Sequence, residues 1–405
     1  MSNYKLLEIS KEEFKNYQGS FLQSVEMSDL LAESGWEVSF LGVKSDQIEL
    51  AALLASLPMM GGKHFEVQYG PVYRPENPEE AEHFFYEAIR DFVKARGALE
   101  LLLIPNVDYQ RFDDGGEPVS EANTGFLTEL SSLGYHHLGL QKGYNMRGES
   151  AWHYVKDLSG LVDEKALLAS YSKDGLYSVK KTQQFGIRVR PLAYDELALF
   201  AEISQQTAER KLYETHDLVY FQKFYKTFGS KAEFLVAEIN FGEFTENLQK
   251  RISELRVQIS KSQSAKKQKQ RDEWQQQILA HQKRLEEVVP YLAKYGTANV
   301  ALAIGLFVYE PSETVYLTSG SDAEFKTFYG PFALQHASML RSIKLGIPSY
   351  NFFGIQGVFD GSDGVLHYKQ SFAGYAVQKV GYFYYYPRPL KHKLISIFKR
   401  ILGRS

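Results

Sequence analysis

The 405-residue chain has no cysteine. Disulfides, thiolate nucleophiles and cysteine-ligated zinc are therefore excluded, and we expect a cytoplasmic address. Long apolar runs are also missing, because the longest, Val300 to Tyr309, covers about ten residues where a membrane-spanning helix needs about 20. The first residues, Met-Ser-Asn-Tyr-Lys, contain no apolar segment of a signal peptide. The sequence thus predicts a protein that is neither secreted nor membrane-spanning.

Common catalytic and ligand-binding motifs are absent as well. The chain has no P-loop, no HExxH, no GxSxG and no GxGxxG after a strand. Its ten histidines are scattered without ligand spacing, so we expect neither a metal site nor a cofactor. The Asp-Asp-Gly-Gly-Glu run at 113–117 lacks the alternating oxygen ligands of a calcium loop and is interpreted as a surface turn.

Glycine and proline are missing between Gly242 and Pro290, where Glu, Gln, Lys, Arg and Ser dominate. Apolar residues recur in this segment at steps of three and four, which predicts two helices folded back as an antiparallel coiled-coil arm over 243–292. A polar stretch at 260–269 would form the tip. The residues at this spacing are Leu248, Ile252, Leu255, Ile259, Trp274, Ile278, His281, Leu285, Val288 and Leu292.

The formal net charge of −3 is unevenly distributed. Residues 245–290 carry ten basic and six acidic side chains, residues 388–405 carry six basic and no acidic ones, and the rest carries 30 basic and 43 acidic. The arm's basic residues cluster at the expected tip, at Lys266, Lys267, Lys269 and Arg271. They indicate either an anion-binding surface or a solvated helical face.

The tail, 388–405, predicts a basic amphipathic helix. Its apolar residues fall at helical spacing and its basic residues, including Lys391, Lys393, Lys399 and Arg400, lie on the other face, as in helices on anionic membrane surfaces. The alternative is a helix packed on the second domain. The apolar positions are Leu390, Leu394, Ile397, Phe398, Ile401 and Leu402.

The remaining sequence is of the α/β class, with α+β character, and contains an internal repeat. Tyr-Gly-Pro at 69–71 precedes a helix, a glycine and a strand, and Tyr-Gly-Pro at 329–331 does the same. We therefore predict tandem copies of one unit, with the first at 1–154 and the second at 155–242 and 293–387, interrupted by the arm. Strands are expected at 50–57, 99–104, 234–239, 300–309 and 314–319.

Two groups of residues suggest a binding site. Lys369 stands among Tyr368, Phe372 and Tyr375 after a glycine-rich loop, where a partly dry site would strengthen its interaction with negative charge. The alternative is a lysine that reaches out of an aromatic core. Thr207 and Arg210 suit recognition of a carboxylate or phosphate, or else belong to a solvated helix end.

The order of these features resembles that of the Fem-type (FemABX) non-ribosomal peptidyltransferases, over nearly the whole chain. Within that family the 359–366 loop and the Tyr-Tyr-Tyr-Pro ending at 384–387 are most similar to the MurN branch, which adds alanine as the second bridge residue. The matching segments are Ser-Phe-Leu-Gln-Ser at 20–24, Tyr-Gly-Pro-Val-Tyr at 69–73, Thr207-x-x-Arg210-Lys211, the arm, and Tyr-Asn-Phe-Phe-Gly at 350–354 through Tyr368-Lys369 to Gly374-Tyr375.

The resemblance implies tandem acetyltransferase-like (GNAT-like) domains and transfer of an amino acid from aminoacyl-tRNA to a lipid-linked peptidoglycan precursor. It implies Lys369 and Tyr368 as catalytic residues, and Arg210, Thr207 and Tyr316 as contacts of the muramyl peptide. The first domain departs from the family, since Met27 and Leu31 replace a Trp and a Lys, and Ile104 stands where relatives carry an Asp before proline. No substrate contact is carried over there.

The reaction needs a neutral amine, a donor for the oxyanion and a proton for the leaving alkoxide. Lys369 is the predicted oxyanion donor, and Asp322, Asp360 and Asp363 are alternative bases. The arm tip, Lys266, Lys267, Lys269 and Arg271, is expected to contact tRNA phosphates. The basic tail is expected to touch the inner membrane face, which makes the protein peripherally membrane-associated.

Two other functions remain open at this point. One is an acyl-CoA N-acyltransferase on the same fold, although the Gln/Arg-x-x-Gly-x-Gly/Ala loop that holds pyrophosphate is absent. The other is a non-catalytic scaffold whose coiled coil recruits partners and whose tail binds membrane.

Overall fold

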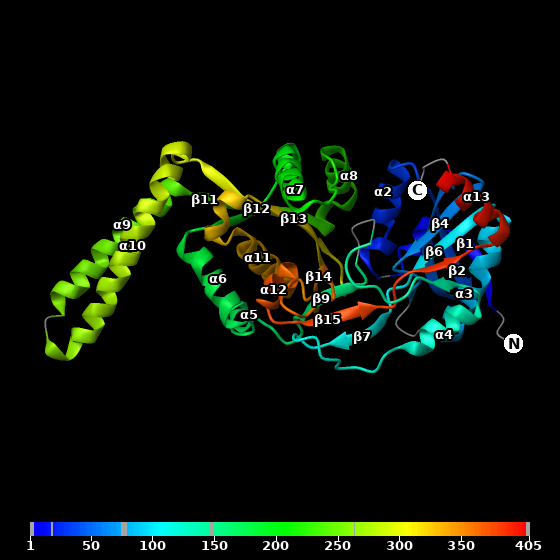
Figure 1. The fold of residues 1–405 in the computed structure, drawn as a ribbon, viewed down its shortest axis with the longest axis horizontal. Coiled ribbons are helices and arrows are strands. Elements are labelled where there is room, and N and C mark those ends of the chain that lie inside the picture. Colours follow the sequence, from blue (N-terminus) through cyan, green and yellow to red (C-terminus); the bar gives the residue numbers. More distant parts are fainter. Residues whose placement is uncertain (1–3, 18, 74–78, 146–149, 263, 402–405) are drawn as a thin grey trace.

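The computed structural model describes residues 4–17, 19–73, 79–145, 150–262 and 264–401. Two mixed β-sheets, each covered by helices, lie side by side, and a helical hairpin projects from the second (Figure 1). The predicted mixed α/β class, with a helical arm inserted in the second unit, is confirmed.

The first sheet is built mainly from the N-terminal third of the chain. Its strand order is β1-β2-β3-β4-β6-β16-β8, with β5 paired to β3. Helix α3 packs on it through a stripe of apolar residues spaced by about one turn: Ala81, Phe85, Ile89 and Val93 are all buried. The strands are β1 Lys5–Ile9, β2 Glu37–Lys44, β3 Ile48–Met59, β4 Gly62–Gln68, β5 Val72–Tyr73, β6 Ala98–Ile104, β8 His136–His137 and β16 Phe383–Tyr385, and the helices are α1 Lys11–Phe14, α2 Val25–Glu33, α3 Glu79–Ala95 and α4 Thr124–Ser132.

The second sheet has the order β10-β11-β12-β13-β14-β9-β15-β7. Helices α7 and α8 cover one face, and α5, α6, α11 and α12 lie on the other (Figure 1). The strands are β7 Asp108–Phe112, β9 Trp152–Asp157, β10 Arg188–Pro191, β11 Ala232–Asn240, β12 Asn299–Tyr309, β13 Thr314–Ser321, β14 Ser349–Ile355 and β15 Tyr375–Lys379, and the helices are α5 Glu164–Ala169, α6 Lys173–Gln184, α7 Leu197–Lys211, α8 Leu218–Phe228, α11 Gly330–Lys344 and α12 Gly364–Gln370.

The two halves exchange strands. Strand β7, from the first half of the chain, pairs antiparallel with β15, with Phe112 opposite Ala376. Strand β16, near the C-terminus, returns to the first sheet, where Phe383 lies opposite Leu103 of β6. The predicted boundary at 154 therefore does not separate the sheets, because β7 precedes it and lies in the second sheet, whereas β16 follows it and lies in the first.

The predicted repeat is visible in both halves. Tyr69 and Tyr329, which open the two Tyr-Gly-Pro turns, both have left-handed backbone conformations, with φ of 56° and 60°. Helices α3 and α11 each end before a glycine with positive φ and lead into a strand, β6 and β14 respectively. Both of these strands pair parallel to an earlier strand, β4 or β13.

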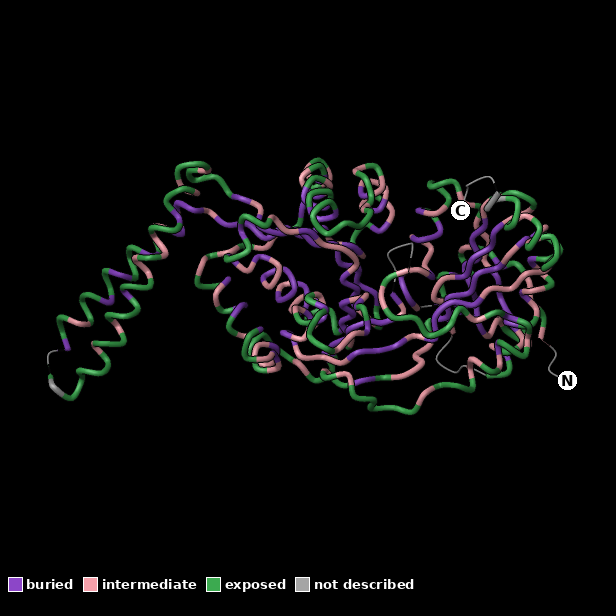
Figure 2. Tube along the Cα trace, viewed as in Figure 1, coloured by how far each residue is buried: buried purple, intermediate pink, exposed green. Residues whose placement is uncertain are grey.

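The arm consists of α9, Phe241–Lys261, and α10, Gln268–Tyr295. Its seam is buried while its outer surface is exposed (Figure 2), and Ile252, Leu255 and Ile278 form a separate apolar cluster along it. At the root, Phe241, Phe244 and Val288 belong to another cluster shared with the second sheet. Helix α10 continues through Pro290 to Tyr295, three residues past the predicted end at 292.

Candidate functional site

Lys369 lies on the short helix α12, which the chain forms because Asp363 caps it. The Asp363 carboxylate accepts hydrogen bonds from the backbone N–H groups of Val365 and Leu366 at 2.9 and 3.2 Å, and from Gln356 at 3.0 Å. The two other carboxylates suggested as bases also close local turns, since Asp360 accepts from Ser362 and Asp322 from Glu324 N–H. The geometry thus gives all three a structural function.

The Lys369 side chain is buried, with 4% of the residue exposed. Its Nζ donates to the carbonyl oxygens of Phe353 at 3.2 Å and Gly354 at 2.5 Å. Burial lowers the pKa of Lys369 to about 7, against the opposing effect of Asp363. An anion brought to this nitrogen would favour the charged form again, which is the behaviour required of an oxyanion donor.

A kink in β14 presents those two carbonyls. The pairing of β14 with β9 is irregular between Asn351 and Gly354, and Phe353 has a φ of 63°. Asn351 Oδ1 accepts the Phe353 N–H at 2.8 Å, and Tyr144 OH donates to Gly354 O at 3.1 Å. A non-glycine residue with positive φ is strained and persists only where its surroundings hold it. The kink is therefore part of how Lys369 is held.

Tyr368, the neighbour of this lysine on α12, and Tyr316 of β13 are both buried among aromatic rings. The Tyr368 hydroxyl donates to Pro331 O at 3.0 Å, and its ring centroid lies 5.0 Å from that of Phe332. Tyr316 is buried and stacks on Phe307 at 5.3 Å. Burial raises the pKa of Tyr316 to about 12 and that of Tyr368 well above its usual value. Both tyrosines are therefore neutral donors at physiological pH.

The parallel strands β13 and β14 separate at this site. They pair at only two positions, Thr314 with Tyr350 and Val315 with Asn351. Tyr316 on β13 and Phe353 on β14, whose carbonyl holds Lys369, both lie just beyond the last pair. Parting of two parallel strands leaves backbone groups on both that a ligand can meet, as at other strand ends in α/β sheets.

Thr207 and Arg210 meet the end of β13. Thr207 Oγ1 accepts the Ser321 N–H at 3.0 Å, and Arg210 Nη2 donates to Ser321 O at 2.9 Å. Helix α7 is thereby fastened to the strand that carries Tyr316. The contacts of Thr207 and Arg210 are with β13, whereas Tyr368 and Lys369 stand on α12, so the predicted residues form two groups joined through β13.

Sequence reasoning missed Lys156, the second buried lysine of this region. It is 3% exposed, and its Nζ donates to Phe372 O at 2.8 Å and Ala373 O at 2.9 Å, just past the end of α12. Burial lowers the pKa of Lys156 to about 8. The only feature of the sequence that pointed to Lys156 was its position shortly after the aromatic segment Trp152–Tyr154.

The 113–117 run is more than a surface turn, which corrects the prediction. Its backbone accepts a hydrogen bond at Asp114 O from Gln370 Nε2 of α12, at 2.6 Å, and the Asp114 carboxylate accepts one from Tyr154 OH. Phe359 packs against Gly116. The exchange of β7 into the second sheet brings this turn onto α12, and a local motif search could not foresee it.

The basic residues of the arm tip differ among themselves. Lys266, Lys267 and Lys269 are exposed. Arg271 is half-buried and donates to the carbonyls of Ser262 at 2.5 Å and Ser264 at 2.9 Å. Arg271 therefore closes the tip, while the three lysines present their charge to solvent.

The tail helix α13, Pro389–Ile401, packs on the first sheet. His392 Nε2 lies 3.3 Å from Glu100 Oε2, and Ile395 packs against Gly61. Packing on the second domain, one of the two alternatives, is thus wrong. Lys391 and Lys393 are exposed, whereas the side chains of Lys399 and Arg400 lie outside the part the structure describes. Four large apolar side chains remain exposed: Leu390 (79%), Leu394 (68%), Ile397 (49%) and Phe398 (56%).

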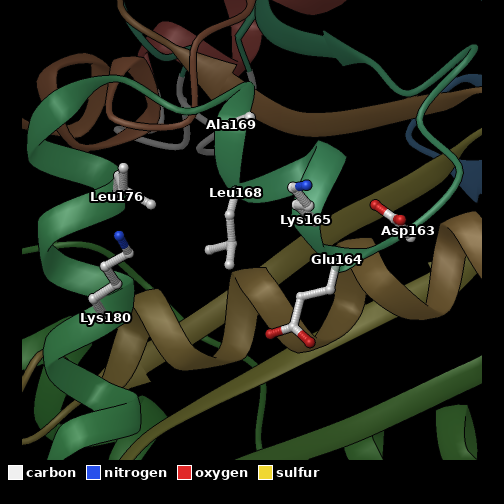
Figure 3. Close-up of a pocket in the computed structure, with 7 residues that line it drawn as sticks. All are labelled: Asp163, Glu164, Lys165, Leu168, Ala169, Leu176 and Lys180. Atoms are coloured by element: carbon white, nitrogen blue, oxygen red, sulfur yellow. The ribbon is translucent and has the colours of Figure 1, made fainter.

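A groove of about 620 Å³ lies between α5 and α6 (Figure 3). Its lining includes Glu164, which also bonds to His336 Nε2 at 3.2 Å and Gln183 Nε2 at 3.0 Å. None of the lining residues is a predicted site residue or a contact of Lys369. This groove is therefore separate from the predicted site residues.

A small cavity of about 30 Å³, enough for a water molecule, lies in the first half. Met27 and Leu31, which replace a Trp and a Lys of relatives, line it together with Gln23. The Gln23 amide is occupied, since Oε1 accepts Leu53 N–H at 2.7 Å and Nε2 donates to Gln68 O at 2.6 Å.

The chain thus has two mixed α/β units with an inserted helical arm, and a buried lysine where two parallel strands part. The FemAB family matches residues 9–400, and the chain belongs to that family. Aminoacyltransferase FemA of Staphylococcus aureus strains NCTC 8325 / PS 47 and MRSA252 is 29% identical over 401 residues, covering 94% of both chains. The solved structure of FemX superimposes with a TM-score of 0.74 at 22% identity, over 96% of this chain and 99% of that one. The protein is thus an aminoacyltransferase, and no described helix is long and apolar enough to span a bilayer.

Proposed function

We propose that this aminoacyltransferase moves alanine from alanyl-tRNA to the lipid-linked peptidoglycan precursor and thereby builds the interpeptide bridge. As in the MurN branch, the acceptor is the first bridge residue, with the stem peptide itself as the alternative. The observation that carries the proposal is the buried Lys369 ammonium, which faces two carbonyls where β13 and β14 part.

The reaction forms a C–N bond between the acceptor amine and the alanyl carbonyl and breaks the C–O bond to the tRNA ribose. Lys369 donates to the oxyanion of the tetrahedral intermediate, where a fixed donor in a dry site has its largest effect. Tyr368 shapes the pocket. The proton lost by the amine ends on the ribose oxygen, so the reaction needs no protein nucleophile and no metal.

Substrate binding is assigned to the end of β13. Arg210, Thr207 and Tyr316 together offer a guanidinium and two hydroxyls to the anionic muramyl peptide or its phosphates. The contacts of Arg210 and Thr207 with Ser321 support this, because they fix both side chains at the end of the strand that carries Tyr316. The product of precursor with alanine would leave from the same side.

The arm tip is assigned to tRNA. Lys266, Lys267 and Lys269 are exposed at the far end of a hairpin rooted in the second sheet, and exposed lysines suit phosphate contacts that carry no sequence information. Arg271 contributes by holding the tip closed and by adding charge.

The tail is assigned to the inner membrane face, where the lipid-linked acceptor is found. Helix α13 keeps Leu390, Leu394, Ile397 and Phe398 exposed, with Lys391 and Lys393 beside them, and Lys399 and Arg400 follow in the sequence. Apolar side chains flanked by basic ones suit an anionic bilayer. A double variant, Leu394→Ser with Phe398→Ser, should lose co-sedimentation with phosphatidylglycerol vesicles, while Ser396→Ala should retain it.

The direct test incubates the protein with lipid-linked precursor, with and without a first bridge residue, and with alanyl-, seryl- or glycyl-tRNA. Product mass should show one added alanine, and more of it on the precursor that already carries a residue. A product only with acyl-CoA, or no product with any charged tRNA, would contradict the proposal.

A further inference from the structure

Four hydrogen bonds connect the first Tyr-Gly-Pro turn with Lys369. Tyr69 OH lies 3.0 Å from His153 Nε2, and His153 Nδ1 lies 3.3 Å from Asn351 Nδ2. Asn351 Oδ1 accepts Phe353 N–H at 2.8 Å, and Phe353 O accepts Lys369 Nζ at 3.2 Å. Because an amide nitrogen only donates, His153 Nδ1 is the acceptor and its Nε2–H donates to Tyr69 OH. The chain of bonds therefore has one consistent direction.

The middle of this chain is rigid. His153 is 1% exposed and Asn351 4%, and Asn351 Nδ2 also donates to Glu313 Oε2 at 3.1 Å. The His153 ring lies 4.8 Å from the ring of Phe353. Burial, together with the charges of Lys379 and Lys369, lowers the pKa of His153 to about 3, so it stays neutral and keeps its tautomer.

We propose that Asn351 and Tyr69 are positioning residues of the transfer reaction, because through His153 they hold the kinked Phe353 carbonyl on Lys369. The inference rests on the proposed role of Lys369. It gives the first half of the chain a part in catalysis without any contact to substrate, through a turn whose first residue, Tyr69, has a left-handed backbone.

The titration of Lys369 can be distinguished from those of Tyr144 and His153, because their pKa values differ widely from that of Lys369. Tyr144 shares the Gly354 carbonyl, and burial raises the pKa of Tyr144 to about 12. His153 lies behind Phe353, with its pKa lowered to about 3, while Asp363 on α12 accepts three backbone hydrogen bonds. Glu313, which faces Asn351, has a pKa raised by burial. Neither Tyr144 nor His153 changes charge between pH 5 and 9.

Two substitutions of Asn351 should act in opposite directions. Asn351→Ala removes the acceptor of Phe353 N–H, so the carbonyl turns away and the charged form of Lys369 loses a partner. The falling limb of rate against pH should then move to lower pH by about half a unit or more. Asn351→Asp keeps an acceptor and adds negative charge, so the limb should move to higher pH. Tyr69→Phe should shift it as the alanine variant does, by less.

The experiment measures kcat/KM against pH for the full chain, and separately titrates Lys369 by NMR of ¹³Cε-labelled lysine without substrate, with Lys369→Arg to assign the signal. Asn299→Ala, an exposed asparagine of β12, serves as the matched control and should change neither measurement. A structural role alone would lower activity in both Asn351 variants without opposite shifts.

Opposite NMR shifts accompanied by opposite shifts of the rate limb would support the proposal. Opposite NMR shifts with an unmoved rate limb would keep the hydrogen-bonded link but overturn the catalytic role of Lys369. An unchanged Lys369 titration in folded Asn351 variants would overturn the link. If circular dichroism showed that those variants do not fold, Tyr69→Phe would decide, since an unmoved titration there overturns it equally.

Discussion

The two halves contain the same strand, helix and strand unit, but their parallel strand pairs differ. In the first half, β4 and β6 pair at six positions from Lys63 to Gln68. In the second, β13 and β14 pair at two. A cavity of about 30 Å³ lies beside the closed pair, whereas the open pair carries Tyr316 and the kinked Phe353, whose carbonyl accepts a hydrogen bond from Lys369. The first half thus keeps its parallel strands paired, while those of the second half part beside the proposed site.

The buried basic side chains of the two halves also differ. His64, in the first half, lies 2.7 Å from Glu100 Oε1 and 3.1 Å from Glu66 Oε2. Burial opposes its charge, but the bonds to both carboxylates outweigh that effect and raise the pKa of His64 to about 9. Lys369, held by carbonyls alone, has its pKa lowered to about 7. A paired base stabilises the fold, and one held only by neutral acceptors is ready for an incoming anion.

The largest expected effect comes from removing Lys369, the buried base beside the parted strands β13 and β14. Lys369→Ala should lower alanyl transfer at least tenfold, since the oxyanion loses its donor. Lys156→Met is the matched control, because it removes another buried lysine bonded to backbone carbonyls. It should leave the rate within about threefold of wild type. Steady-state assays on variants with intact circular dichroism test this, and equal losses in both would mean that burial of a lysine, not its place, matters.

A smaller effect is expected at the arm, which belongs to the second half only. Replacing Lys266, Lys267 and Lys269 by Gln should raise the KM for alanyl-tRNA about fivefold at 0.15 M salt and flatten its salt dependence, because phosphate contacts release counterions. The KM for the precursor should stay constant. Replacing the exposed acidic residues Asp272 and Glu273 by Asn and Gln is the control for a surface change. Unaltered salt dependence would remove the tip from tRNA binding.

Sequence patterns predicted those features of the fold that depend on the spacing of residues close together in the chain. The arm, the five strands, the two Tyr-Gly-Pro turns and Lys369 all rest on periodicity or on contiguous motifs, and each appears in the structure. The exchange of β7 and β16, the contact of Asp114 with α12 and the link from Tyr69 to Asn351 join residues from 84 to more than 250 positions apart. No local pattern encodes such pairings, because they depend on the register of whole strands. Lys156 was missed for the same reason.

The contributions of His64 in the first half and Lys369 in the second half to the free energy of unfolding should change with pH in opposite directions. In the folded state His64 binds its proton more tightly than in the unfolded chain, so its contribution is full below about 6.5 and is lost as pH rises through about 9. His64→Gln should therefore lower the free energy of unfolding by about 3 kcal/mol at pH 6 and by much less at pH 9.5. Urea unfolding at both pH values measures this, and an equal loss at the two would contradict the assigned pKa.

Lys369 should show the reverse trend. Its folded pKa of about 7 lies below the unfolded value of about 10.4, so the unfolded chain holds more protons between these values and stability rises with pH. Lys369→Met removes the cost of the buried charge and should stabilise the protein by about 1 kcal/mol at pH 7, less as pH approaches 10. Lys156→Met should also stabilise the protein at low pH, and this effect should decrease as pH rises from about 8 towards the unfolded pKa of about 10.4. If Lys369→Met instead destabilised the protein most at pH 7, its ammonium would be held as firmly as the paired His64, and the two halves would not differ in this respect.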